Sequence, residues 1–343
     1  MALIVLADDG IEFDGRTPEE RPLGGVESSV VNLVEELAGR GHEVLVRNNC
    51  EGPLTHKGVD WAPIAQGMPE AADLYIANRG DKLLNLMPGA RRMAFWIHNP
   101  AGYLLKWRYL TKLWRTRPTI VFIGEYHSTT YPGWAPDGGR KIIPYGIADI
   151  FLGAGRLAET PGPRAVFTSN PLRSLDWLLD LWAGRIHEAA PGAQLHVFSG
   201  AATYGRVGEA KARQMEAVLD KARGLAGLGV VLRDPLPKPE LIEELRLSKV
   251  MLYRGDLNET FCLAVGEAQA LGVPAVVQDL GSVGERVIDG ETGFVAPDDE
   301  SFADAAVRIL SDDGLWRRHH ESALEKQGRW GWAEAAEAFE GLI

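Results

Sequence analysis

Short apolar runs alternate with longer amphipathic stretches along the whole chain. A short continuous apolar run predicts a strand covered on both faces, and apolar positions three or four apart predict a helix. In the first half, the predicted strands are Ala2–Ala7, Glu43–Arg47, Asp73–Ala77, Met93–Ile97, Thr119–Ile123 and Lys141–Ile143. The clearest helix is Val26–Ala38, whose apolar residues share one face: Val26, Val30, Leu33, Val34 and Leu37. This alternation predicts βαβ units around a parallel sheet.

A second set of alternating elements begins near Arg164. Its predicted strands are Ala165–Thr168, Leu195–Phe198, Val230–Leu232, Val250–Tyr253 and Ala275–Gln278, and its predicted helices are Ser174–His187, Gly208–Arg223, Pro239–Leu247 and Cys262–Leu271. Phe151–Pro163 is rich in Gly, Pro and Ala without apolar periodicity, so we interpret it as a linker. Trp330–Leu342 reads as a final helix.

The chain has 343 residues, which is long for a single core. We therefore predict an α/β protein of two doubly wound, Rossmann-like domains. In such sheets, ligands bind outside the carboxyl ends of the strands, so a cleft between the two domains is the expected place for a site.

Charge and cysteine content narrow the function. The net charge is −11, with 16 basic against 18 acidic residues in positions 1–150 and 20 against 29 in the remainder, which argues against nucleic acid as a partner. The two cysteines, Cys50 and Cys262, form neither a disulfide framework nor a zinc motif, and a cytoplasmic protein is expected. The first residues read as a strand rather than a signal peptide. We find no Asp-x-Asp metal clamp and predict no metal.

The strongest local chemistry lies around the helix predicted to begin near Phe261 or Cys262. The amides of Phe261, Cys262 and Leu263 in its first turn would form an anion site. Glu259 just before them could accept hydrogen bonds from sugar hydroxyls, and Glu267 could bind a ribose diol. On local grounds alone, the two acids could equally be an ordinary helix N-terminal residue and a surface residue.

The segment Asn258–Val277, NETFCLAVGEAQALGVPAVV, resembles the signature of the family 4 retaining glycosyltransferases, whose fold is GT-B. Other segments resemble the same family in the same order. They are the Gly24-Gly25-Val26-Glu27 loop, the Ile143-Pro144-Tyr145-Gly146-Ile147 turn, the stretch from Gly281 to Val295 that follows the last predicted strand, and the tail helix Trp330–Phe339.

The resemblance implies a GT-B arrangement: residues 1–150 as the acceptor-side domain, 151–163 as the linker, 164–328 as the donor-binding domain and 329–343 as a tail helix crossing back to the first domain. It implies a nucleoside-diphosphate sugar as donor substrate, an acceptor hydroxyl, retention of configuration and no cofactor. Glu259 would contact the donor sugar, Glu267 the ribose, and the amides of Phe261 to Leu263 the diphosphate.

The chain departs from the family pattern after the first strand of the second domain. The family places an Arg and then a Lys there, both on the donor phosphates. Here the segment runs Thr168-Ser169-Asn170-Pro171-Leu172-Arg173, so that Arg173 stands in the place of the Lys and the upstream Arg is absent. Arg173 can hold phosphate through its fork of donors. We include Ser169 and Asn170 in the donor site, and the alternative for Arg173 is a solvent-facing neighbour of the helix cap.

Two further candidates lie in the first half. Gly24 and Gly25 would let the backbone approach a donor closely at a helix N-terminus, or they could form an ordinary turn. His98 follows the strand Met93–Ile97. The resemblance implies a histidine facing the donor sugar in this region, and the alternative is a hydrogen-bonded structural histidine. The predicted catalytic residues are thus Glu259, His98 and Arg173.

Tyr103–Pro118 carries five cations and no acid: Lys106, Arg108, Lys112, Arg115 and Arg117. Leu104, Trp107, Leu110 and Trp114 line one side of this predicted helix. The pattern is typical of a helix at an anionic membrane surface or an anionic acceptor, although a packed helix with a basic outer side gives the same pattern. A glycan, a lipid-linked molecule or a small molecule are all expected acceptors.

Other functions remain open on these residues. The same fold supports epimerases and phosphorylases. A non-catalytic sugar-nucleotide-binding module, derived from a transferase that lost the upstream Arg, is a further alternative.

Overall fold

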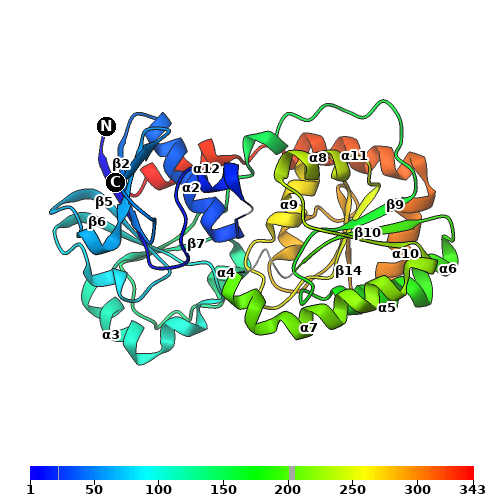
Figure 1. Cartoon of the computed structure of the whole chain (residues 1–343), viewed down its shortest axis with the longest axis horizontal. Coiled ribbons are helices and arrows are strands. Elements are labelled where there is room, and N and C mark those ends of the chain that lie inside the picture. The colour runs from blue at the N-terminus through cyan, green and yellow to red at the C-terminus, as the bar shows by residue number, and fades with distance from the viewer. Residues whose placement is uncertain (22, 201–204) are drawn as a thin grey trace. The chain divides into compact units, whose positions relative to one another are not determined.

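The computed structural model describes residues 1–21, 23–200 and 205–343, and the chain divides into two units (Figure 1). Unit 1 comprises Met1–Gly146 together with the tail Trp330–Ile343, and unit 2 comprises Ile147–Arg329. Each unit is an α/β domain built on one sheet, so the prediction of two doubly wound domains is confirmed.

Among the described residues, the sheet of unit 1 has the strand order β3-β4-β2-β1-β5-β6-β7-β8. All neighbouring pairs are parallel except β3 with β4. The strands are β1 (Leu3–Asp8), β2 (Glu43–Asn48), β3 (Leu54–His56), β4 (Val59–Pro63), β5 (Ala72–Asn78), β6 (Ala90–Trp96), β7 (Thr119–Phe122) and β8 (Gly139–Ile142). The central strands β1 and β5 are almost entirely buried, which explains their continuous apolar runs.

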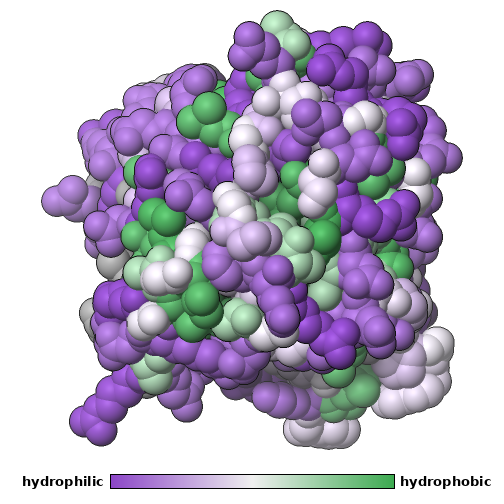
Figure 2. All heavy atoms as spheres, turned by 90° about the vertical axis from the view of Figure 1, so that its right-hand side faces the viewer, coloured by the Kyte–Doolittle hydropathy of each residue, from purple (hydrophilic) through white to green (hydrophobic). Residues whose placement is uncertain are grey.

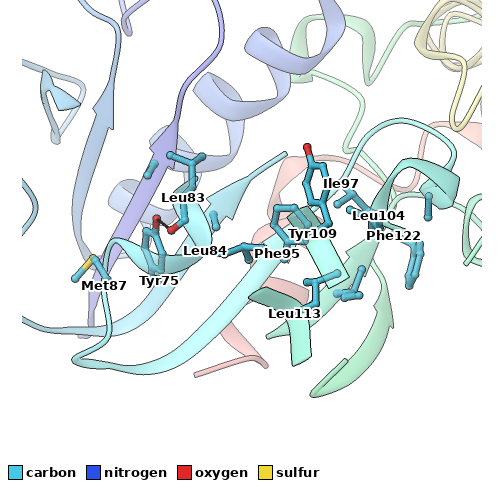
Figure 3. Close-up of a cluster of buried hydrophobic side chains, with 14 of the residues drawn as sticks. Tyr75, Leu83, Leu84, Met87, Phe95, Ile97, Leu104, Tyr109, Leu113 and Phe122 are labelled. Atoms are coloured by element: carbon cyan, nitrogen blue, oxygen red, sulfur yellow. Dashed lines mark hydrogen bonds between the residues drawn. The ribbon is translucent and has the colours of Figure 1, made fainter. Parts of the chain in front are cut away.

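The helices of unit 1 are α1 (Thr17–Glu20), α2 (Gly25–Gly39), α3 (Trp107–Thr116), α4 (Glu125–Thr129) and α12 (Trp332–Glu340). Tyr109 and Leu113 on α3 point into a buried cluster with Phe95, Leu104 and Phe122 (Figure 3). This cluster fixes which side of α3 faces the protein.

The tail helix α12 packs against α2 within unit 1 (Figure 1). Glu340 at its end accepts two hydrogen bonds from Arg40, at 2.8 Å from Nε and 2.7 Å from Nη2, and lies 2.8 Å from His42 Nε2. Two-point guanidinium pairing of this kind fixes direction as well as distance. It therefore holds the last turn of the chain on the C-terminal end of α2.

Glu340→Gln should lower the thermal midpoint at pH 6, and its difference from wild type should shrink as the pH falls below about 4.5. Hydrogen bonding from Arg40 holds the pKa of Glu340 at about 2, below its ordinary 4.5. The pair thus adds stability that is present above pH 4.5 and is lost as the pH falls toward 2. Thermal unfolding between pH 6 and pH 3 measures the effect, with exposed Glu337→Gln as the control. A difference that did not change with pH would contradict this account.

The sheet of unit 2, in its described part, is all-parallel with the order β11-β10-β9-β12-β13-β14. The strands are β9 (Arg164–Phe167), β10 (Gln194–Phe198), β11 (Val230–Arg233), β12 (Val250–Tyr253), β13 (Ala275–Gln278) and β14 (Gly293–Ala296). Counted from the first strand of the unit, this is the order 3-2-1-4-5-6 of dinucleotide-binding sheets. The order in which successive strands are added to the sheet reverses between β9 and β12, which makes their carboxyl ends the expected ligand-binding point.

The helices of unit 2 are α5 (Leu175–Leu181), α6 (His187–Ala189), α7 (Gly205–Gly224), α8 (Lys238–Arg246), α9 (Leu263–Ala270), α10 (Asp299–Ser311) and α11 (Asp313–Gln327). A π-helical turn, Trp182–Ile186, joins α5 to α6. Figure 2 shows one face of the molecule, on which hydrophilic side chains predominate and apolar ones form small groups between them.

Three features differ from the sequence-based expectations. The strands β3 and β4 were not predicted, because they are short and lie at the edge of the sheet. The last strand is β14 (Gly293–Ala296), which overlaps the end of Gly281–Val295, rather than Ala275–Gln278. In Tyr103–Pro118, α3 begins only at Trp107, and Leu104 is buried in the preceding 3-10 turn. Trp107 and Trp114 of the predicted apolar side are exposed, and Tyr109 and Leu113 face the core instead.

Candidate functional site

The strand order of unit 2 brings two of the predicted site segments to neighbouring strand ends. Ser169, Asn170 and Arg173 follow β9, while Asp256 and Glu259 follow β12, and these strands are hydrogen-bonded neighbours. Their loops meet at the point where the strand order reverses, where open parallel sheets bind ligands.

Arg173 and Glu259 form an ion pair at this point. Arg173 Nη1 lies 3.2 Å from Glu259 Oε2 and 3.6 Å from Asp256 Oδ1. Burial alone lowers the pKa of the guanidinium, but the charge of Glu259, together with Tyr253 and Asp256, raises it above the ordinary value. Arg173 Nη1 is buried in this ion pair, but 32% of the side chain stays exposed, so the guanidinium keeps donors for a ligand.

Tyr253 holds the other side of Glu259. Its hydroxyl donates to Glu259 Oε2 at 2.8 Å, and the ring is fully buried at the end of β12. Burial raises the pKa of this phenol well above its ordinary range, so it remains a donor at neutral pH. Glu259 is therefore held by a neutral donor and a cation, and its carboxylate has a fixed direction.

The loop after β9 is held by its own backbone. Asn170 Oδ1 accepts from the Leu172 amide at 2.9 Å, and the Asn170 carbonyl accepts from the Arg173 amide at 2.8 Å. The Ser169 carbonyl accepts from the hydroxyl of Ser199, which follows β10, at 2.6 Å. The side chain of Asn170 thus shapes the turn that presents Arg173.

The helix α9 begins one or two residues later than the sequence predicts, at Leu263, because Cys262 has left-handed backbone angles (φ 67°, ψ 71°). The first-turn amides without helical partners are consequently those of Cys262, Leu263, Ala264 and Val265. Phe261 and Cys262 are almost completely buried. Burial also raises the pKa of the Cys262 thiol well above its ordinary value, which makes it an unreactive neutral group.

Cys262→Val should unfold at a lower temperature than wild type, whereas Cys262→Gly should stay close to wild type. A β-branched side chain at positive φ costs about 1–3 kcal/mol, and glycine adopts this conformation without strain. Glycine relieves the backbone strain but loses the stability contributed by burying the thiol, so the two effects oppose each other. Thermal unfolding gives the unfolding midpoints of the two variants and of wild type. A valine variant as stable as wild type would show that the backbone at position 262 is not strained.

Glu267 lies further along the chain in unit 2, on α9, and its hydrogen-bond partner is Lys238. It is buried on α9, and its two carboxylate oxygens each accept from Lys238 Nζ at 2.6 Å. Lys238 is the first residue of α8, with half of its side chain exposed and its ammonium 5.3 Å from the centre of the Phe151 ring. Glu267 is thus a buried, paired carboxylate rather than a surface acid.

Gly24 and Gly25 lie in unit 1, where Gly24 is the N-cap of α2 with extended backbone. Glu27 in the first turn of this helix is buried and accepts from Arg79 Nη2 at 2.9 Å. Arg79 also donates to both carboxylate oxygens of Asp8, at 3.1 and 3.2 Å. The glycine loop therefore leads into an ionic network at the ends of β1 and β5.

His98, also in unit 1, ends this network. Asp8 accepts from Asn78 Nδ2 at 2.6 Å, so the Asn78 oxygen faces His98 Nε2 and accepts its hydrogen. His98 Nδ1 then accepts from the Tyr145 hydroxyl at 2.5 Å. Burial, with Arg79 as a further cause, lowers the pKa of His98 well below its ordinary value, so the ring is neutral. These hydrogen bonds assign the Nε2–H tautomer.

The structure therefore brings Arg173, Ser169, Asn170 and Glu259 together in unit 2. Glu267 lies further along α9, and the candidates Gly24, Gly25 and His98 belong to unit 1. Sequence analysis missed Tyr253 and Lys238 as partners of the two glutamates, and only the position of Tyr253 at a predicted strand end could have indicated the first. The described residues contain no group of three or more His, Cys, Asp or Glu side chains suited to a metal ion.

The comparison with protein families matches residues 163–312 to the family Glycosyl transferases group 1. A D-inositol 3-phosphate glycosyltransferase of Corynebacterium diphtheriae is 35% identical over 111 residues, 32% of this chain and 26% of that relative. That match spans about a quarter of the relative's length. The enzyme of the same name from Nocardia farcinica is 25% identical across 92% of this chain and 83% of the relative.

Solved structures of low identity share the fold. Sucrose-phosphate synthase from Thermosynechococcus elongatus has a TM-score of 0.76 at 17% identity, covering 99% of this chain and 97% of the other. HepE from Anabaena, in complex with UDP and glucose, has a TM-score of 0.72 at 13% identity over 99% of each chain. WaaG, a glycosyltransferase involved in lipopolysaccharide biosynthesis, has a TM-score of 0.69 at 14% identity. Residues 163–312 thus match the group 1 glycosyltransferase family, and the two doubly wound units have the GT-B fold.

Proposed function

We propose that the protein transfers a sugar from a nucleoside-diphosphate sugar to an acceptor hydroxyl, and that unit 2 binds the donor. The observation that carries this proposal is the Arg173–Glu259 pair at the switch point between β9 and β12, within the region that matches the transferase family. A half-buried cation beside a fixed carboxylate suits a phosphate next to a sugar.

The donor would divide between three features of unit 2. Arg173 and the first-turn amides of α9 would hold the diphosphate, because a helix N-terminus and a guanidinium both favour phosphate oxygens. Glu259, oriented by Tyr253, would accept hydrogen bonds from the sugar hydroxyls. Glu267 would accept hydrogen bonds from the ribose hydroxyls while it stays paired with Lys238. Lys238 thus adds a cation near the donor that sequence analysis did not identify.

In the reaction, the bond between the anomeric carbon and the diphosphate oxygen breaks, and a bond forms from that carbon to the acceptor oxygen. Negative charge grows on the diphosphate, where Arg173 and the α9 amides would stabilise it as fixed dipoles do. The acceptor proton would pass to the leaving diphosphate on the same face of the sugar, giving retention. This route assigns no metal and no other cofactor.

The acceptor and the cellular place are further parts of the proposal. A hydroxyl of a glycan, a lipid-linked molecule or a small molecule would serve as acceptor in glycan or glycoconjugate synthesis. We place the protein in the cytoplasm with a peripheral contact to an anionic membrane, carried by unit 1.

A thermal-shift screen with uridine, guanosine, adenosine and thymidine diphosphates tests the donor site. A diphosphate that binds the folded protein raises the unfolding midpoint with concentration. Uridine diphosphate is the first compound to test, because the HepE complex contains UDP and glucose. The absence of any shift with all four compounds would contradict the proposed donor site.

Release of nucleoside diphosphate from the matching donor then identifies the reaction. A transferase releases it in the presence of acceptor without free phosphate, a phosphorylase requires phosphate, and an epimerase changes the sugar without releasing the nucleotide. Binding with none of these reactions would favour the non-catalytic module.

A further inference from the structure

Three tryptophans of unit 1 are exposed to an extent that core packing does not explain. Trp107, Trp114 and Trp134 have 79%, 73% and 71% of their surface accessible. Trp107 and Trp114 are two turns apart on α3 and therefore share a face, opposite to Tyr109 and Leu113 in the core (Figure 3). Trp134 comes from a different segment, the loop after α4.

These indoles surround one hollow. All three line a cavity of 660 Å³ together with Leu110, Thr111 and Arg117. A second hollow of 520 Å³ shares Arg117 and is lined by Arg91, Arg92 and Arg115, so that apolar and cationic surfaces adjoin. We call this combined surface the tryptophan–arginine face, defined by Trp107, Trp114, Trp134, Arg91, Arg92 and Arg117.

The charge on this face is not neutralised locally. Arg91, Arg92 and Arg117 are exposed, and no carboxylate in the described part of the chain pairs with them. By contrast, Asp81 is paired with Lys112 at 2.6 Å, and Asp137 with Arg140 at 2.8 Å. A concentrated positive surface on a chain of net charge −11 indicates an anionic partner.

We propose that the tryptophan–arginine face is a membrane-binding surface that rests on an anionic phospholipid bilayer, with its three indoles at the level of the headgroups and its guanidiniums on lipid phosphates. This inference rests on the proposed peripheral contact and specifies its residues. Indole rings prefer the membrane–water interface, and arginines near the bilayer gain from its negative surface potential. An uncharged glycan would account for the indoles but not for the unpaired guanidiniums.

The proposed surface would contact one leaflet of the bilayer without crossing it. Among the described residues no helix has the length and apolar character needed to span a bilayer. The buried face of α3 belongs to the core of unit 1, so the helix does not have to unfold or turn over for its outer indoles to contact lipid. The face is thus preformed in the folded domain.

Co-sedimentation of the full chain with vesicles tests the proposal without donor or acceptor. Wild type should pellet with vesicles of phosphatidylcholine and phosphatidylglycerol at low salt, pellet far less with phosphatidylcholine alone, and dissociate as salt rises. Charge reversal of Arg91, Arg92 and Arg117 to Glu should lower partitioning by roughly 100-fold. Trp107→Ser, Trp114→Ser and Trp134→Ser combined should lower it by about 10-fold or more with all charges intact.

The matched control reverses three exposed cations of unit 2, Lys211, Arg213 and Arg318, to give the same net charge. This variant should bind vesicles like wild type, and the thermal midpoint of each variant checks that it is folded. Failure of wild type to pellet with anionic vesicles at low salt would overturn the proposal. So would retained binding by the tryptophan variant, a tryptophan-dependent dimer in place of vesicle binding, or tryptophan-dependent binding of neutral oligosaccharides alone. The thermal shift with nucleoside diphosphates is independent of these results, so the donor site and the membrane face can fail separately.

Discussion

Glu259→Gln is expected to lower turnover by roughly 100-fold or more while leaving nucleoside-diphosphate affinity unchanged or tighter. In the proposed reaction Glu259 contacts the donor sugar, and losing an interaction that strengthens in the transition state lowers turnover. In the free protein the same carboxylate lies 3.2 Å from Arg173, so its neutralisation also releases the cation for phosphate. Steady-state kinetics and calorimetric titration with the diphosphate measure the two effects.

Asp256→Asn is the matched control for this change. Asp256 is the second carboxylate near Arg173, at 3.6 Å, and its loss removes the same charge from the same loop. The control should retain most of the turnover if the position of Glu259, rather than the charge of the loop, matters. Unchanged turnover in a folded Glu259→Gln protein would remove this residue from the reaction.

Arg173→Ala is expected to weaken nucleoside-diphosphate binding by about 1.5–3 kcal/mol, a factor of roughly 10 to 150 in Kd. Its guanidinium supplies a charge-assisted donor that the α9 amides do not replace. The variant also leaves Glu259 without its cation, which adds repulsion toward the diphosphate. Calorimetry on wild type and variant measures the difference.

Arg233→Ala provides the comparison for Arg173. Arg233 is a cation at the end of β11, at the edge of the same sheet, where it pairs with Glu244 at 2.8 Å. Its removal changes the net charge equally but does not touch the switch point. Equal affinities of wild type and Arg173→Ala would mean that the diphosphate relies on other groups.

The fold was predictable because its central strands are buried on both faces. Strands such as β1 and β12 consist almost wholly of apolar residues, and a helix separates each from the next strand. The short antiparallel strand β3 was not predictable on that basis, because its three residues are exposed or half-exposed and only Leu54 is apolar. Periodicity predicted an amphipathic α3, but tryptophan suits both a core and a wet surface, so the pattern alone did not show which side faces inward.

The meeting of candidate site residues was predictable where they directly follow a strand. Arg173 and Glu259 stand a few residues after β9 and β12, so the topology brings them together. Glu267 is different, because its partner Lys238 is 29 residues away in sequence and no local pattern joins them. The start of α9 was misplaced because left-handed backbone at Cys262, a conformation that favours glycine, leaves no mark in the sequence.

The most direct measurement is an experimental structure of the protein with the nucleoside diphosphate that gives the largest thermal shift. The account predicts the diphosphate within hydrogen-bonding distance of Arg173 and the first-turn amides of α9, with the ribose hydroxyls on Glu267. A diphosphate bound elsewhere, with the Arg173–Glu259 pair unchanged from the free protein, would contradict it.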